Sequence, residues 1–531
     1  MKKRFVAAML AGTMALSILA GCGTSEDTNS VGTSENSNSE LVFVNYRDIR
    51  DLNPHLYAGE MYAQSMLYDT LVSITDDGYE GCLAESWEIS EDGKIYTFKI
   101  REGVTFSDGA VCDANAILAN FNAIIANKER HTWLEMMNLL VGVSAPDDYT
   151  FVIELSEAYY PMLTELGCIR PFAMISPNCM IDGQTKDGVN GYIGTGPYVL
   201  TDFVTDEYAV FERNENYWGE LPAIEKITVK VIPDNQTRIM ALESGEIDLI
   251  FGKNMLDADA ISQYTDSDKF TVSLSDPTST RHIVLNTTND ILSDVTVRQA
   301  LQHATDRNAI SEGIFYGLEQ PADTLYSKTV PYCDVDLEPY EYSADTASEM
   351  LEKAGWIMGK DGIRYKYGQK LELELLYNSD SVTEKTISEY LQSEYAKLGI
   401  SINIHGEEEQ SYRDSMKAGN FDMVFNICWG MPYDPQSSLA AMRAPVYGDY
   451  AAQLGLEDKA EIDKAITDIL TSTDETERQE LYTFVLTRLH EDAVYIPLTY
   501  ECNKALYTSD LQGVHFGTDQ YDVPFADMYF E

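Results

Sequence analysis

The sequence predicts an α/β protein with two or more domains. At 531 residues, with 44% hydrophobic and 23% charged residues, the chain is longer than one hydrophobic core usually organises. From about residue 346 to residue 427, segments with helix and strand patterns alternate, which is typical of a mixed or parallel sheet covered on both faces. Residues 83–100 instead alternate with period two around a Glu-Asp-Gly turn, which predicts a β-hairpin.

The N-terminus has the pattern of a secretory signal peptide over residues 1–21. Three basic residues, Lys2 to Arg4, precede an apolar run that ends at Ala20. The Leu-Ala-Gly-Cys sequence that follows is similar to the lipobox of bacterial lipoproteins, which implies cleavage before Cys22 and acylation of its sulfur. A plain secreted protein with a chance cysteine is the alternative. No other run approaches the roughly 20 apolar residues that span a bilayer.

The next segment and the overall charge limit the possible partners. Residues 23–40 are almost entirely Ser, Asn, Thr, Gly and acids, so residues 22–39 are expected to form a lipid anchor and a flexible tether. The formal charge of −50 repels nucleic acid and anionic lipid, and neither is expected as a partner. An isolated positive side chain inside a cleft would stand out in such a chain.

The cysteines and histidines do not form a recognisable metal or catalytic pattern. The seven cysteines after Cys22 are scattered, odd in number and without CxxC spacing, and we expect most of them to be buried; Cys168 and Cys179 could pair. The seven histidines are dispersed, with no pair at ligand spacing. Nucleophile-elbow, zinc-protease and phosphate-loop motifs are absent from the sequence. The sequence therefore predicts no enzyme, no permanent cofactor and no metal site made by protein side chains alone.

Local patterns predict the elements along the chain. The first half is expected to contain an edge strand at 41–46, a helix at 58–72 with Met61 near its start, the hairpin at 83–100, a helix ending near 121, a tight crossover at 194–198, strands at 208–213, 227–232 and 247–251, and a helix at 236–244. The second half is expected to contain strands at 282–286, 371–377, 400–405, 423–427 and 494–498, and helices after Asp294 and at 346–354, 382–398, 412–418, 460–472 and 476–490.

Several aromatic and arginine residues are candidates for ligand binding. Trp429 and Tyr433 lie on a proline-stiffened loop after the strand at 423–427, where they either wall a ligand cleft or simply pack. Arg130 and Trp133 share a face at i, i+3 spacing. Arg170 lies between an apolar residue and a proline, where an arginine either pairs with a carboxylate of the protein or binds one from a ligand.

Longer motifs resemble the extracytoplasmic solute-binding proteins of peptide and nickel ABC importers, family 5. The resemblance covers about residues 41–497 and rests on LAESWEISEDGKIYTFKIREGVTFSDGAVCDA, GTGPYVL, NENYWGELPAIEKITVKVIPD, ALESGEIDL and NTTNDILSDVTVRQALQHATDR. A narrower similarity to the nickel-binding, NikA-like branch rests on LNPHLY, RHTWLE, RNENYWGELPAI, LEKAGW, GEEE, WGMPYDP and TRLHEDAVYIP.

This resemblance implies a ligand pocket and a ligand class. The branch binds nickel as a chelate of small carboxylate or amino-acid molecules, and the pocket positions in this sequence are Met61, Arg130, Trp133, Arg170, Trp429 and Tyr433. Tyr447 is a further candidate ligand-binding residue. It stands where the best-known members present a histidine to the metal, which puts direct protein coordination in doubt. The resemblance therefore implies a complete metal chelate, with the metal bound through its chelator.

The resemblance also implies the architecture and the partners. The expected fold is two-lobed and periplasmic-binding-protein-like (type II, cluster C), with a hinge of two crossovers. Lobe one would span 40–281 with an inserted subdomain at about 81–194, lobe two 282–499, and residues 500–531 would return to lobe one. The expected protein is a monomeric receptor on the outer face of the membrane, held only by its lipid and serving an ABC permease and its ATPase. A di- or oligopeptide receptor on the same scaffold is the alternative; a hydrolase is a further one.

Overall fold

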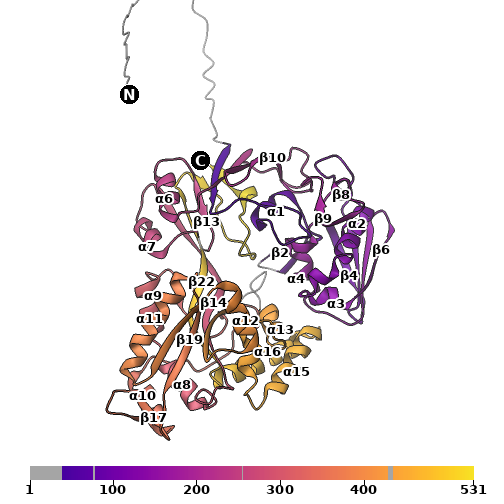
Figure 1. Cartoon of the computed structure of the whole chain (residues 1–531). Helices are drawn as coiled ribbons and strands as arrows, with labels where there is room; N and C mark the ends of the chain where they lie inside the picture. The colour runs from indigo at the N-terminus through magenta and orange to yellow at the C-terminus, as the bar shows by residue number, and fades with distance from the viewer. Residues whose placement is uncertain (1–38, 76–77, 254, 429–434) are drawn as a thin grey trace, which may run out of the picture. The chain divides into compact units, whose positions relative to one another are not determined.

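The computed structural model describes residues 39–75, 78–253, 255–428 and 435–531, so Cys22, Trp429 and Tyr433 lie outside the described residues. Within this part of the chain, an 11-stranded mixed sheet forms the centre of the fold (Figure 1). Its strands in spatial order are β10 (Tyr198–Val204), β11 (Tyr208–Arg213), β12 (Lys226–Val231), β1 (Glu40–Asn45), β13 (Leu249–Phe251), β22 (Tyr495–Thr508), β14 (Phe270–Leu285), β21 (Met423–Cys428), β19 (Glu372–Asn378) and β20 (Ser401–Glu407), with β15 (Gln320–Pro321) paired to β22.

Two long antiparallel strands, β14 and β22, connect the two halves of this sheet (Figure 1). They are 16 and 14 residues long, whereas the sequence predicted only short strands at 282–286 and 494–498. Arg281 is the register partner of Thr499, so the two predicted lobe boundaries face each other across this pair. The boundaries themselves stay a prediction.

Strand β1 lies inside the sheet. It pairs in parallel with β12 on one side and with β13 on the other, so the prediction of an edge strand is wrong. Its alternating Leu41 and Phe43 are both buried in one hydrophobic cluster. Because β1 and β13 are parallel, the residues that follow each strand meet at the same edge of the sheet.

A separate four-stranded sheet contains the predicted hairpin. Its order is β4 (Ala84–Ile89), β5 (Ile95–Ile100), β7 (Thr150–Leu155) and β6 (Leu140–Asp147), and the β4–β5 hairpin is confirmed. Helix α2 (Ala114–Ile125) packs against it through Ile117 and Phe121, and Asp113 caps the helix by accepting from the N–H groups of Asn115 and Ala116.

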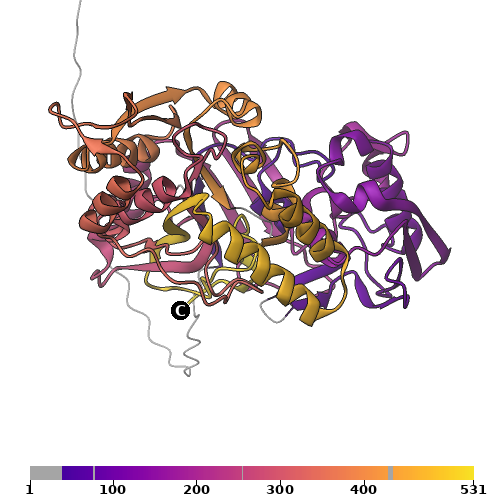
Figure 2. The same ribbon diagram turned by 90° about the horizontal axis from the view of Figure 1, so that it is seen from below.

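Helices cover both faces of the sheet in the second half of the chain. Ile283 and Leu285 of β14 point into one hydrophobic cluster, with α8 (Val295–His303), α10 (Ala344–Lys353) and α11 (Val382–Lys397). Val284, between them, points into another, with α15 (Lys459–Thr471) and α16 (Glu475–Glu491). Figure 2 shows these two groups of helices on opposite sides of the strands. The α/β arrangement predicted from alternating elements is confirmed.

The remaining elements are short. The other helices are α1 (Met61–Leu67), η1 (Lys128–His131), α3 (Glu135–Leu139), α4 (Met162–Gly167), α5 (Ile169–Phe172), η2 (Pro177–Cys179), α6 (Asn235–Glu243), α7 (Ala258–Ile261), η3 (Ser262–Tyr264), α9 (Arg307–Ile314), α12 (Glu409–Ala418), α13 (Pro435–Ala441), α14 (Gly448–Gln453) and η4 (Phe525–Asp527). The small ribbons are β2 (Val72–Thr75) with β3 (Gly78–Gly81), β8 (Met180–Ile181) with β9 (Gln184–Val189), β16 (Ile357–Met358) with β17 (Arg364–Lys366) and β18 (Gln369–Lys370), and β23 (Leu511–Gln512) with β24 (Tyr529–Phe530).

The Gly-Thr-Gly-Pro crossover packs tightly against the end of α1. A Cβ atom on Gly194 or Gly196 would collide with the backbone of Leu67, so both positions require glycine. The interpretation of this motif as a tight crossover is consistent with that contact.

Tyr160, which follows β7, contacts helices α15 and α16. The Arg478 guanidinium of α16 lies 3.4 Å from the centroid of the Tyr160 ring, and the Tyr160 N–H donates to the Leu470 carbonyl at 3.1 Å. The Tyr160 hydroxyl also donates to Glu475 at 2.8 Å. Arg478 itself is fully buried.

The seven cysteines of the described chain are all free and buried, as expected for small apolar side chains. The proposed pairing of Cys168 with Cys179 is therefore wrong. Burial raises the pKa of the Cys82 and Cys112 thiols. Across the described residues, none of the helices combines the length and apolar character needed to cross a membrane.

Candidate functional site

One cavity brings together three of the residues predicted to bind ligand. Met61, Trp133 and Arg170 line a cavity of about 430 Å³, a size typical of small-molecule sites. Met61 is the first residue of α1, which confirms its placement near a helix start. Aromatic and apolar walls come from Phe43, Tyr46, Tyr57, Tyr62, Phe251 and Tyr521.

Arg170 presents a half-buried positive charge to this cavity. Its Nε donates to Gln64 Oε1 at 2.6 Å, and its Nη2 donates to the Gly59 carbonyl. Neither partner is charged, and among the described residues Arg170 forms no ion pair with a carboxylate. Burial lowers the pKa of the guanidinium, while Glu60 and Asp519, which lie farther away, favour its charged form. Of the two roles considered for Arg170, ligand binding fits this environment better than a structural ion pair.

Tyr57 organises the neighbouring wall and was not predicted as a site residue. Trp133 Nε1 donates to the Tyr57 hydroxyl at 2.9 Å, and that hydroxyl lies 2.7 Å from His131 Nδ1. The Arg130 guanidinium lies over the Tyr57 ring, 5.6 Å from its centroid. Arg130 does not itself line the cavity, so Tyr57 connects it to the cavity wall. Burial raises the pKa of Tyr57 to about 12, so the hydroxyl stays protonated at neutral pH.

The cavity also carries charged residues that sequence reasoning missed. They are Arg47, Arg50, Glu60, Lys253 and Asp522. Arg47 forms an ion pair with Glu60 at 2.6 Å, whereas Arg50 is exposed. Arg47 and Lys253 follow the parallel strands β1 and β13, whose carboxyl ends meet at one edge of the sheet. Ligand sites commonly form at the carboxyl ends of parallel strands. This rule could have predicted both Arg47 and Lys253 as site residues.

Tyr447 lies apart from the cavity. It precedes α14, is half-buried and is not among the cavity-lining residues. It lies within electrostatic reach of Arg413 and Asp449, and also of Tyr521, which does line the cavity. The structure therefore brings Met61, Trp133 and Arg170 together, places Arg130 beside them and leaves Tyr447 outside.

Next to Tyr447, Asp449 is a buried acid whose pKa is raised. Its carboxylate accepts from Asn426 Nδ2 at 2.8 Å, but burial outweighs its hydrogen bonds and raises its pKa to about 6. Because the folded-state pKa exceeds the ordinary value, ionisation of Asp449 costs folding free energy as the pH rises from about 4 to about 6.

We therefore expect the unfolding free energy of the wild type, relative to Asp449→Asn, to fall by about 1–2 kcal/mol between pH 5 and pH 7.5. Urea unfolding at both pH values measures this difference, and pH 5 stays above the sequence pI of 4.3. Because asparagine cannot ionise, the variant controls for the titration of every other acid. Parallel pH profiles for the two proteins would show that Asp449 titrates normally.

Side chains that commonly bind metal are not clustered in the described residues. No three His, Cys, Asp or Glu side chains of this part of the chain come together in a way that could hold a metal ion. The arrangement in the cavity, cations beside aromatic rings, instead suits a small molecule with carboxylate groups.

Comparison with known proteins gives a consistent result. The profile of the bacterial extracellular solute-binding proteins, family 5 Middle, matches residues 78–449. The nickel-binding periplasmic protein of Escherichia coli K12 is 41% identical over 486 residues, which cover 91% of this chain and 93% of that protein. The periplasmic oligopeptide-binding protein OppA of Salmonella typhimurium is 27% identical, and the match covers 98% of this chain and 97% of that protein.

A solved structure matches over almost the same length. NikA from Brucella suis, crystallised in complex with Fe(III)-EDTA, superposes with a TM-score of 0.90 at 43% identity. The match covers 93% of this chain and all of that one. The predicted two-lobed, periplasmic-binding-protein-like α/β fold is thereby confirmed.

Proposed function

The chain belongs to the bacterial extracellular solute-binding proteins of family 5, and we propose that it captures nickel, or a related transition metal, as a small-molecule chelate. In this proposal it is the receptor of an ABC importer. It delivers the chelate to a membrane permease that a cytoplasmic ATPase drives. The similarity to a nickel-binding protein at 41% identity and to a structure holding a metal chelate supports this ligand class.

One observation carries the proposal: Arg170 is a half-buried cation with no carboxylate partner among the described residues, on the wall of a cavity rich in aromatic side chains. Withdrawing a charge from water is costly unless the charge is paired. A carboxylate of the chelator supplies the missing partner and binds the arginine fork with two hydrogen bonds. The chelator also supplies the metal ligands, so the protein needs no permanent cofactor of its own.

Isothermal titration tests this function directly. The purified protein is titrated with nickel alone, with nickel and histidine, with nickel and EDTA, and with metal-free di- and tripeptides. We expect heat from at least one nickel chelate and none from the peptides. Tight binding of metal-free peptides, with no response to any nickel chelate, would overturn the proposal.

A peptide receptor is the second candidate function, and one side chain of the cavity, Asp522, favours it. Asp522 lines the same cavity, and its Oδ1 is buried with no hydrogen-bond partner among the described residues. A carboxylate in that position suits the ammonium group of a peptide. Asp434, the residue first considered for this role, lies outside the described residues. The peptide arm of the titration decides between the two ligands.

Attachment to the membrane is also part of the proposal. Cys22 becomes the acylated first residue and anchors the receptor to the outer face of the membrane, with residues 23–39 as the tether. The receptor acts as a monomer. Cells that express Cys22→Ser should release the protein from the membrane fraction; a variant that stays in that fraction would contradict the lipid anchor.

Lobe movement completes the proposed mechanism. We place lobe one at 40–281 and 500–531, with an inserted subdomain at about 81–194, and lobe two at 282–499. The hinge lies where Arg281 of β14 pairs with Thr499 of β22. A ligand that contacts both lobes stabilises the closed arrangement.

A further inference from the structure

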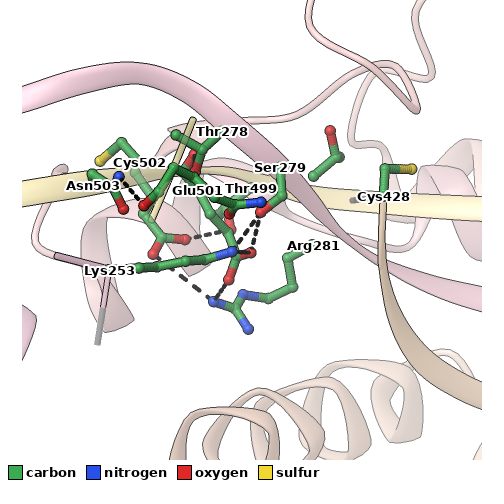
Figure 3. Close-up of polar contacts among 12 residues, drawn as sticks. Lys253, Thr278, Ser279, Arg281, Cys428, Thr499, Glu501, Cys502 and Asn503 are labelled. Atoms are coloured by element: carbon green, nitrogen blue, oxygen red, sulfur yellow. Dashed lines mark hydrogen bonds and ion pairs between the residues drawn. The ribbon is translucent and has the colours of Figure 1, made fainter. Parts of the chain in front are cut away.

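A buried ion cluster lies where β14 and β22 pair (Figure 3), and one of its residues, Lys253, lines the cavity. At its centre is Glu501 of β22, whose side chain is only 4% exposed. It accepts from Lys253 Nζ at 2.5 Å and from Ser279 Oγ at 2.5 Å, and it forms an ion pair with Arg281. These contacts hold the pKa of Glu501 well below its usual range, against the opposing effect of burial. Glu501 is therefore ionised at neutral pH.

A second acid, Glu319, supports the far side of the cluster. It accepts from Thr499 Oγ1 at 2.7 Å and lies 3.6 Å from Lys504 Nζ and 3.9 Å from the Arg281 guanidinium. Glu384 adds a more distant negative charge near Arg281. Arg281 and Lys504 are thus surrounded by acids of the protein, and neither lines the cavity.

Lys253 differs from the other cations of the cluster because it lines the cavity. Its side chain is 20% exposed, against 5% for Lys504. A lysine ammonium has three N–H donors. Glu501 and Ser279 accept from it at 2.5 and 2.6 Å, which leaves one donor without a partner among the described residues.

This geometry produces a fixed positive group on the cavity wall. Glu501 and Ser279 hold the ammonium in place, so little side-chain entropy remains to be lost when a ligand binds. Glu501 pairs with both Lys253 and Arg281. One carboxylate cannot neutralise two cations, so Lys253 keeps part of its positive charge. The unused N–H can donate to an anionic oxygen in the cavity, in addition to any carboxylate that Arg170 binds.

We propose that Lys253 is a specificity-determining residue that binds an anionic oxygen of the ligand, so that the cavity prefers metal chelates with net negative charge over neutral ones. The ligand class is a metal–polycarboxylate complex with at least two free carboxylate oxygens. This inference rests on the proposed function, because it assumes that the ligand is a chelate.

The test compares one anionic and one neutral chelate of the same metal. Nickel–EDTA carries two negative charges, and the nickel complex of two histidines is neutral. Isothermal titration of the wild type and of Lys253→Met with both complexes gives four dissociation constants. We expect Lys253→Met to weaken nickel–EDTA binding by about 10- to 100-fold, as expected for a lost hydrogen bond to a charged group, and to change nickel–histidine binding less than about threefold.

Two further variants separate ligand binding from structure. Lys504→Met removes a cation from the same cluster but not from the cavity, and should leave the ratio of the two affinities unchanged. Lys253→Arg keeps the charge and should retain the preference for the anionic chelate. Thermal unfolding confirms that each variant is folded at the assay temperature.

The outcomes are distinct. Equal weakening of both chelates by Lys253→Met, or no change in either, overturns the role of Lys253 while the proposed function stands. A wild type that binds neither chelate overturns the proposed function and this inference with it.

Discussion

Replacing Arg478 with methionine is expected to lower the free energy of unfolding by about 3–5 kcal/mol, because two carbonyl acceptors, one buried and one partly buried, lose their donor at a cost of about 1–3 kcal/mol each. The guanidinium is fully buried, and its Nη1 donates to the Ile469 carbonyl and, at 3.4 Å, to the Ser472 carbonyl. These carbonyls end helix α15, where backbone acceptors lack partners in the helix and the dipole favours a cation. Methionine fills a similar volume but offers no donor.

The matched control is Tyr160→Phe, which keeps the ring beneath the guanidinium. It removes only the hydroxyl that bonds to Glu475 at 2.8 Å and to Tyr332 at 3.0 Å, so a loss of about 1 kcal/mol is expected. Urea unfolding of both variants measures the two values. If Arg478→Met loses no more than Tyr160→Phe, the helix-end contacts of Arg478 contribute little.

Replacing Arg170 with methionine is expected to weaken binding of the nickel chelate by about 30- to 150-fold, the equivalent of about 2–3 kcal/mol for lost charge-assisted hydrogen bonds. The loss of stability should be smaller, about 1–2 kcal/mol, because the buried Gln64 Oε1 and the Gly59 carbonyl lose their donor. Titration calorimetry and thermal unfolding on the same preparations compare the two losses.

Arg213→Met is the control for Arg170→Met. Arg213 is also an arginine with hydrogen-bonded partners, but it pairs with Glu215 and Glu225 and does not line the cavity. Its replacement should leave chelate binding unchanged. Arg170→Lys keeps the charge but lacks the two parallel N–H donors of the guanidinium. It should bind the chelate with an affinity between those of the wild type and Arg170→Met. If Arg170→Met unfolds at assay temperature, or loses stability but not affinity, Arg170 is a structural residue.

The sequence predicted the alternating part of the fold well, because buried strands and amphipathic helices leave a clear period. It underestimated β14 and β22 for a physical reason. Every residue of β22 from Tyr495 to Tyr507 is buried, so no alternation is visible, and the charged Glu501 and Lys504 break the apolar run that would indicate a buried strand. In β14, Asp276 and Pro277 interrupt the apolar pattern, whereas the strand continues through register shifts at Pro277.

The site was predicted only in part. Arg130, Trp133 and Arg170 lie in motifs that can be read locally. The role proposed for Lys253 arises because β13 runs beside β1 and because Glu501, almost 250 positions later, holds its ammonium. Such a role depends on pairing between distant strands, which no local pattern specifies.

The buried thiols make the receptor well suited to fluorescence measurements. Burial raises the pKa of the thiols of Cys82, Cys112 and Cys428, and thiolate is the form that reacts with maleimide dyes. In the proposed lipid-anchored receptor, in which Cys22 is acylated, cysteines introduced at the exposed Glu212 and Glu389 become the reactive ones. A donor–acceptor dye pair at these two positions can test the proposed lobe movement on the intact receptor, with no need to remove a native cysteine.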